Sequence, residues 1–158
     1  MKASWKVGFS FGLTSGVIAT LGLMVGLNAS TQSKLAVVGG VLVIALADAM
    51  ADALGIHVSE ESDHSRSTKE VWESTIATFL AKVFFATTFV VPVLVFELSI
   101  AVLVSVIWGL LLIGIFSYYI SKKKDSGCWK VIAEHLSLTI AVIIASHAIG
   151  VAVRSIFG

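Results

Sequence analysis

No charged side chain occurs between Val7 and Ser33. A helix of about 20 apolar residues is long enough to cross the hydrocarbon core of a bilayer, so this run alone suffices for one membrane span. The whole chain of 158 residues is 57% hydrophobic and only 13% charged, with a mean hydropathy of +0.97. Because soluble domains carry about 25% charged residues, the sequence predicts an integral membrane protein.

Four further apolar runs follow the first. We predict an all-α, polytopic membrane protein, a five-transmembrane-helix bundle in which a single membrane domain covers residues 1–158. The spans are expected at about 7–27, 35–56, 74–96, 99–120 and 131–157, with a charged cytoplasmic segment at 57–73. Lys2 and Lys6 before an apolar run are also typical of a signal peptide, but the length and glycine pattern of the run favour a retained span.

Positive charges are distributed unevenly over the two sides that this topology defines. One side receives only Lys34 and Arg154, and the other receives the remaining loop charges. Because basic residues are enriched in cytoplasmic loops, this split places the N-terminus in the cytoplasm. The small size and the lack of a processed targeting signal favour a prokaryotic plasma membrane. The cytoplasmic set is Lys2, Lys6, Arg66, Lys69, Lys122, Lys123, Lys124 and Lys130.

Several classes of function have little support in the sequence. The net charge of +1 provides no concentrated basic face for nucleic acid. Cys128 is the single cysteine, which excludes an internal disulfide and a multi-cysteine zinc site. We find no Ser/His/Asp arrangement, phosphate loop or haem motif, and therefore expect neither an enzyme nor a covalently bound cofactor.

The first span carries a glycine pattern that predicts close helix packing. Gly8, Gly12 and Gly16 are four residues apart and so lie on one face of a helix. Small residues at such positions allow two membrane helices to approach closely.

Asp48 and Asp52 are the first candidates for a functional site. They stand four residues apart on the second span and therefore share one helix face. Carboxylates inside a membrane are unfavourable by about 2.5 kcal/mol or more and by default mark an ion or proton pathway. The alternative is that both are hydrated near the cytoplasmic end and merely pair with Lys82. That lysine is either an internal counter-charge, which would compete with a bound cation, or extends to the cytoplasmic surface.

Other residues could extend a metal site. His147 in the last span is either a ligand or a helix-to-helix hydrogen bonder. Met24 and Met50 either supply soft sulfur ligands or simply pack. In the charged segment, His57 with Glu61 and Glu60 with His64 are four apart, so a helix there would align each pair. These side chains either collect divalent metal at the cytoplasmic mouth or form a solvated acidic face.

Three stretches resemble the vacuolar iron transporter family. Residues 15–27 (SGVIATLGLMVGL) resemble the family's first-helix segment, which begins Asp-Gly and runs through Thr-Leu to a later Gly. Residues 53–59 (ALGIHVS) resemble its Ala-Leu-Gly-Glu-Tyr-x-Ser at the end of the second helix, and residues 148–158 resemble its terminal Ile-Gly-Arg pattern. The family's acids fall on Ser15 and Ile56 here, its methionine falls near Asp52, and the cytoplasmic segment is much shorter.

The resemblance implies a homodimer with the ion pathway at its interface, so that Asp48 and Asp52 of two chains would provide four carboxylates. We therefore predict a dimeric transporter that exports a divalent metal ion such as iron(II) or manganese(II), with proton exchange as a candidate driving reaction. Asp48 and Asp52 would be its membrane ligands. The alternatives are a non-transporting scaffold that kept the fold and lost the site, and a proton or monovalent-cation pathway. The assisting residues would be His57, Glu60, Glu61, His64, Met24, Met50 and His147, with Lys82 as charge partner.

Overall fold

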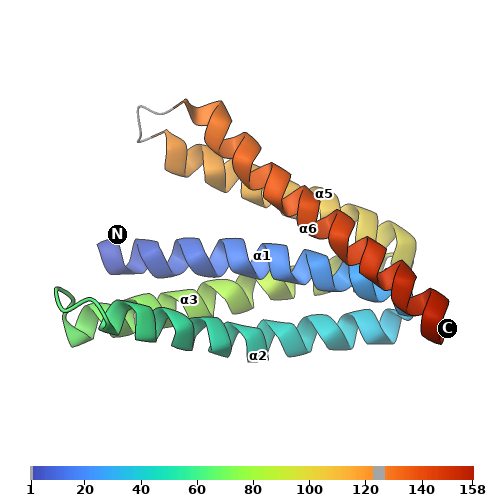
Figure 1. Cartoon of the computed structure of the whole chain (residues 1–158), viewed down its shortest axis with the longest axis horizontal. Helices are drawn as coiled ribbons and strands as arrows, with labels where there is room; N and C mark the ends of the chain where they lie inside the picture. The colour runs from blue at the N-terminus through green and yellow to red at the C-terminus, as the bar shows by residue number, and fades with distance from the viewer. Residues whose placement is uncertain (1, 123–126) are drawn as a thin grey trace. The chain divides into compact units, whose positions relative to one another are not determined.

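The computed structural model describes residues 2–122 and 127–158, and within them all regular structure is helical (Figure 1). Five helical segments there have the length and apolar composition to cross a bilayer, α3 and α4 together forming one of them. The predicted all-α fold with five membrane-spanning helices is thus confirmed. The helices are α1 (Ala3–Thr31), α2 (Lys34–Glu61), α3 (Thr68–Thr88), α4 (Val90–Val95), α5 (Leu98–Ser121) and α6 (Cys128–Phe157).

The third helix begins earlier than the hydropathy of the sequence predicts. Ser67 and Glu70 form a reciprocal cap: the Glu70 backbone N–H donates to the Ser67 hydroxyl at 3.4 Å, and the Ser67 N–H donates to the Glu70 carboxylate at 3.0 Å. Such a cap satisfies amide groups that have no partner within the helix. It starts α3 at Thr68 rather than near Ser74, and so adds more than a turn of helix before the apolar residues.

The same span is interrupted near its far end. Pro92 has no amide hydrogen, and its ring crowds the carbonyl group of the residue four positions earlier. The Phe89 amide donates instead to the Ala86 carbonyl at 3.2 Å, three residues back, and α3 ends before α4 begins at Val90.

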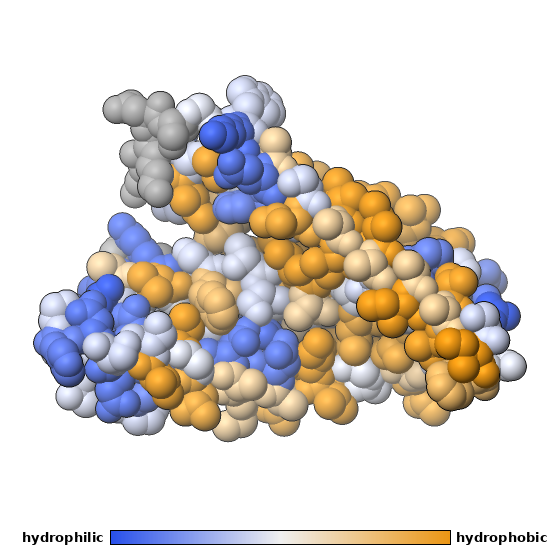
Figure 2. All heavy atoms as spheres, in the orientation of Figure 1, coloured by the Kyte–Doolittle hydropathy of each residue, from blue (hydrophilic) through white to orange (hydrophobic). Residues whose placement is uncertain are grey.

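The chain divides into two compact units. The first comprises Met1–Thr20 and Val41–Val90, and the second comprises Leu21–Gly40 and Val91–Gly158. In the first unit, the beginning of α1, the larger part of α2 and α3 run side by side (Figure 1). In the second, α5 packs against α6. Apolar side chains cover much of the surface, whereas hydrophilic ones gather where the chain passes from α2 to α3 (Figure 2). Lys123 and Lys124 lie outside the described residues.

The predicted glycine face of α1 is the surface on which α3 packs. A Cβ atom at Gly8 would collide with the Ser74 carbonyl oxygen, and one at Gly12 would collide with that of Thr78. At Gly16 the added atom would lie 3.2 Å from the Cα atom of Lys82. The glycines thus bring the backbones of α1 and α3 together over two turns, as small residues do in membrane helices.

We expect Gly12→Ala to lower the free energy of unfolding by about 1–3 kcal/mol, because the added methyl group overpacks this contact. The matched control is Gly55→Ala on α2, where no atom lies within 4 Å of the new Cβ. Alanine there should be neutral or stabilise the helix by about 0.5–1 kcal/mol. Unfolding of the purified protein by SDS in mixed micelles measures both. Equal stability of the two variants would show that α1 and α3 do not need the glycine contact.

Candidate functional site: a lysine between two aspartates

Lys82 lies between the two aspartates of α2. Its Nζ atom forms ion pairs with Oδ2 of Asp48 and Oδ2 of Asp52, and only 2% of its side chain is exposed. The sequence left two positions open for this side chain, an internal counter-charge or an extension to the surface. The structure has the internal counter-charge. We call Asp48, Lys82 and Asp52 the charged triad.

Ser15 joins the triad from α1. Its hydroxyl donates a hydrogen bond to Oδ2 of Asp52 and accepts one from the Lys82 ammonium at 2.9 Å. The contact follows from the glycine packing, because Gly16, the next residue, is the one that touches the backbone of Lys82. Three helices therefore meet at one polar network inside the first unit.

Asp48 and Lys82 lie near the middle of the helical segments that carry them, and Asp52 lies one turn closer to the end of α2. Asp48 is 14 residues after the first residue of α2, Lys34, and 13 before its last, Glu61. Lys82 is 14 residues after Thr68 and 13 before the end of α4 at Val95. At 1.5 Å per residue, 14 residues correspond to about 21 Å of helix. The ammonium group of Lys82 is neutralised where it lies, because it pairs with both carboxylates.

The formal charge of the triad is −1, since two carboxylates face one ammonium group. The side chains of Asp48 and Asp52 are 35% and 22% exposed, respectively, in contrast to the buried lysine. Asp52 has two partners, Lys82 and Ser15, whereas Lys82 is the partner that the described residues give to Asp48. Asp48 is therefore the more accessible and the less constrained of the two carboxylates.

Of the remaining predicted intramembrane ligands, Met50 belongs to the first unit, and Met24 and His147 belong to the second. Met50 lies on α2 but is 60% exposed. Met24 lies in the core of the second unit, and His147 lies on its surface.

The side chains of the charged segment form several local contacts. α2 ends at Glu61, so the helix that would align Glu60 with His64 is not present. Glu60 pairs with Arg66 at 3.3 Å, and both Glu61 and His64 are exposed. His57 Nδ1 lies 3.0 Å from the Thr75 hydroxyl on α3. Within residues 2–122 and 127–158, no three histidine, cysteine, aspartate or glutamate side chains are grouped so as to hold a metal ion.

Asp63 in this segment is held in its charged form by local hydrogen bonds. The side chain and the backbone N–H of Ser65 both donate to its carboxylate, at 2.7 and 3.0 Å, and lower its pKa below the ordinary value. Arg66 contributes a smaller effect in the same direction. The segment between α2 and α3 is therefore organised by its own polar contacts.

Two polar contacts had no signal in the sequence analysis. Ser15 drew attention only as the residue that replaces a family acid, yet its hydroxyl links Asp52 to Lys82. In the second unit, the Ser117 hydroxyl lies 2.7 Å from His135 Nδ1, between α5 and α6. The spacing of residues within one helix cannot reveal either contact, because each contact joins two separate helices.

In comparisons with known proteins, no family model, no curated protein and no solved structure matches the chain. The class that fold and site together define is an integral membrane protein with an intramembrane charged triad. The resemblance to the vacuolar iron transporters stays a prediction.

Replacement of Lys82 by methionine should lower the free energy of unfolding by up to about 3–5 kcal/mol, because it leaves two neighbouring carboxylates without their counter-charge. Removing all three charges, in Asp48→Asn/Lys82→Met/Asp52→Asn, should restore most of that loss. SDS unfolding in micelles gives both values. If the single and triple variants are equally stable, the three charges do not act as a unit.

Proposed function

We propose that this protein is a small membrane transporter in which the charged triad is a proton-exchange site. The observation that carries the proposal is a formal charge of −1 on side chains of two helical segments, α2 and α3–α4, that are long and apolar enough to cross a membrane. Intramembrane ionisable groups typically belong to ion or proton pathways. One proton on a carboxylate makes the triad neutral, and release of that proton restores the charge.

The accessible carboxylate is the natural place for this proton. When Asp48 is protonated, Lys82 still has Asp52 as its partner, and Ser15 still donates to Asp52. The ammonium group therefore never lacks a counter-charge during the exchange. This division of roles, with Asp48 as the exchanging group and Asp52 as the fixed partner, agrees with their unequal exposure.

A second candidate is the dimeric export of a divalent metal ion, with the same aspartates as ligands. The partial exposure of Asp48 and Asp52 favours it, because a second chain could approach their open sides and complete a ring of four carboxylates. Hard and borderline divalent ions prefer such oxygen ligands. Lys82 would first have to leave, since its ammonium group occupies the space between the carboxylates.

Asp48→Asn gives a sharp test of the proton-exchange proposal. The variant retains the neutral pair of Lys82 and Asp52, so its stability should equal or exceed that of the wild type. Its proton flux in liposomes, followed with a pH-sensitive dye under an imposed pH gradient, should fall to that of protein-free vesicles. Glu97→Gln, which removes a carboxylate at the start of α5 and outside the triad, is the matched control and should retain full flux.

The same vesicles separate the alternatives. Flux that requires iron(II) or manganese(II) and is lost in Asp48→Asn would favour metal export over proton exchange alone. Proton flux that persists in a folded Asp48→Asn variant would contradict the assignment of the site. A folded wild-type protein that moves neither protons nor metal would favour the non-transporting scaffold.

A further inference from the structure

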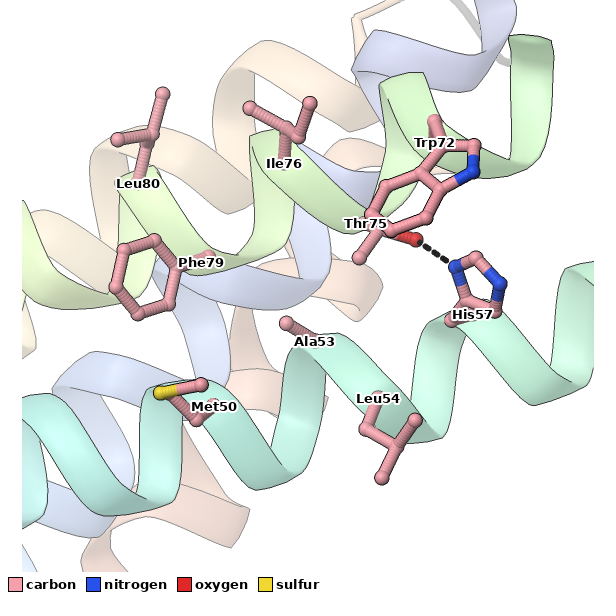
Figure 3. Close-up of a pocket in the computed structure, with 9 residues that line it drawn as sticks. All are labelled: Met50, Ala53, Leu54, His57, Trp72, Thr75, Ile76, Phe79 and Leu80. Atoms are coloured by element: carbon pink, nitrogen blue, oxygen red, sulfur yellow. Dashed lines mark hydrogen bonds between the residues drawn. The ribbon is translucent and has the colours of Figure 1, made fainter.

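A groove of about 380 Å³ lies between α2 and α3 of the first unit (Figure 3). Met50, Phe79 and Leu80 line one end of it, and His57, Trp72 and Thr75 line the other. Its volume is within the range of small-molecule sites in proteins. The groove thus has an apolar body and one polar end, as an amphipathic ligand requires.

The hydrogen bonds at the polar end fix which nitrogen of His57 carries a hydrogen. The Thr75 hydroxyl donates its single hydrogen to the Val71 carbonyl at 2.7 Å. It therefore accepts from Nδ1 of His57, 3.0 Å away. In the neutral imidazole ring the other nitrogen, Nε2, is then a hydrogen-bond acceptor.

Trp72 supplies a donor at the same end. Its ring packs edge-to-face on His57, with the ring centroids 4.8 Å apart. The indole nitrogen of Trp72 and Nε2 of His57 both lie at the edge of the groove farthest from Leu80 and Phe79 (Figure 3). A ligand headgroup there meets one N–H donor and one nitrogen acceptor.

One acidic and one basic side chain continue the two walls. Glu61 is four residues after His57 on α2, and Lys69 is three residues before Trp72 on α3, so helical spacing places each one turn farther along the same face. Both are exposed. Neither forms an ion pair of 4 Å or less within the part of the chain that the structure describes. The headgroup end of the groove thus has an acidic side chain on its α2 side and a basic side chain on its α3 side.

We propose that this groove binds phosphatidylethanolamine, with an acyl chain in the apolar body. The phosphate accepts hydrogen bonds from the indole N–H of Trp72 and from Lys69. The primary ammonium group donates to Nε2 of His57 and pairs with Glu61. An anionic glycerol headgroup leaves Glu61 without a positive partner, and a quaternary ammonium group has no hydrogen to donate to His57.

The headgroup preference is testable by native mass spectrometry of the purified full chain with equal amounts of phosphatidylethanolamine, phosphatidylcholine and phosphatidylglycerol. We expect about fivefold preferential retention of phosphatidylethanolamine, in line with the effect of one charge at a membrane surface. Glu61→Lys should shift the preference to phosphatidylglycerol. The control Glu134→Lys, which makes the same charge change on α6 outside the groove, should leave it unchanged.

Occupancy of the groove itself requires a second pair of variants. Ile76→Trp fills the groove with an indole ring and should abolish selective retention, whereas Leu103→Trp at an exposed position on α5 should not. Circular dichroism verifies that both variants fold. Equal retention of the three lipids by the wild type, selective retention that survives Ile76→Trp, or a copurified uncharged ligand such as a quinol in the groove would each overturn the proposal.

Discussion

The ion pairs of Lys82 are the constraint on which the first unit depends. An ammonium group within a membrane span is strongly unfavourable without a partner. Asp48 and Asp52 supply the opposite charge from one face of α2. The helices that carry these groups are therefore held together by a requirement of charge, in surroundings where apolar burial gives little preference for one helix contact over another.

This charge arrangement relies on a backbone contact in another helix. Gly8, Gly12 and Gly16 allow α1 to lie directly against α3, and the last of them meets the backbone of Lys82 itself. As a result, Ser15 is close enough to hydrogen-bond both the lysine and Asp52. The polar network and the glycine packing thus belong to one helix contact, so that a change in either one alters the other.

Much of the fold could be predicted from the sequence because hydropathy alone separates spans from loops. The shared face of Asp48 and Asp52 and the glycine face of α1 also follow directly from helical spacing. The position of Lys82 could not be predicted in the same way. Its spacing left two positions open, and the ion pairs that decide between them depend on how α2 packs on α3.

The candidate site was harder to predict than the fold, because its contacts join different helices. Helical spacing would align Glu60 with His64, but α2 ends at Glu61, before the second of them. The contact of His57 Nδ1 with Thr75 on the next helix had no signal in the spacing of α2. Partners that are 18 or more residues apart are set by how helices pack, and a single sequence contains little information on that.

The depth of the charged triad also has an electrical consequence. Moving one elementary charge across a membrane potential of 100 mV changes its free energy by about 2.3 kcal/mol. In the proposed exchange, a proton that crosses half of that field to reach the triad would change its free energy by about 1.2 kcal/mol, or its occupancy about sevenfold. Membrane voltage would then act on the proposed site independently of the pH on either side.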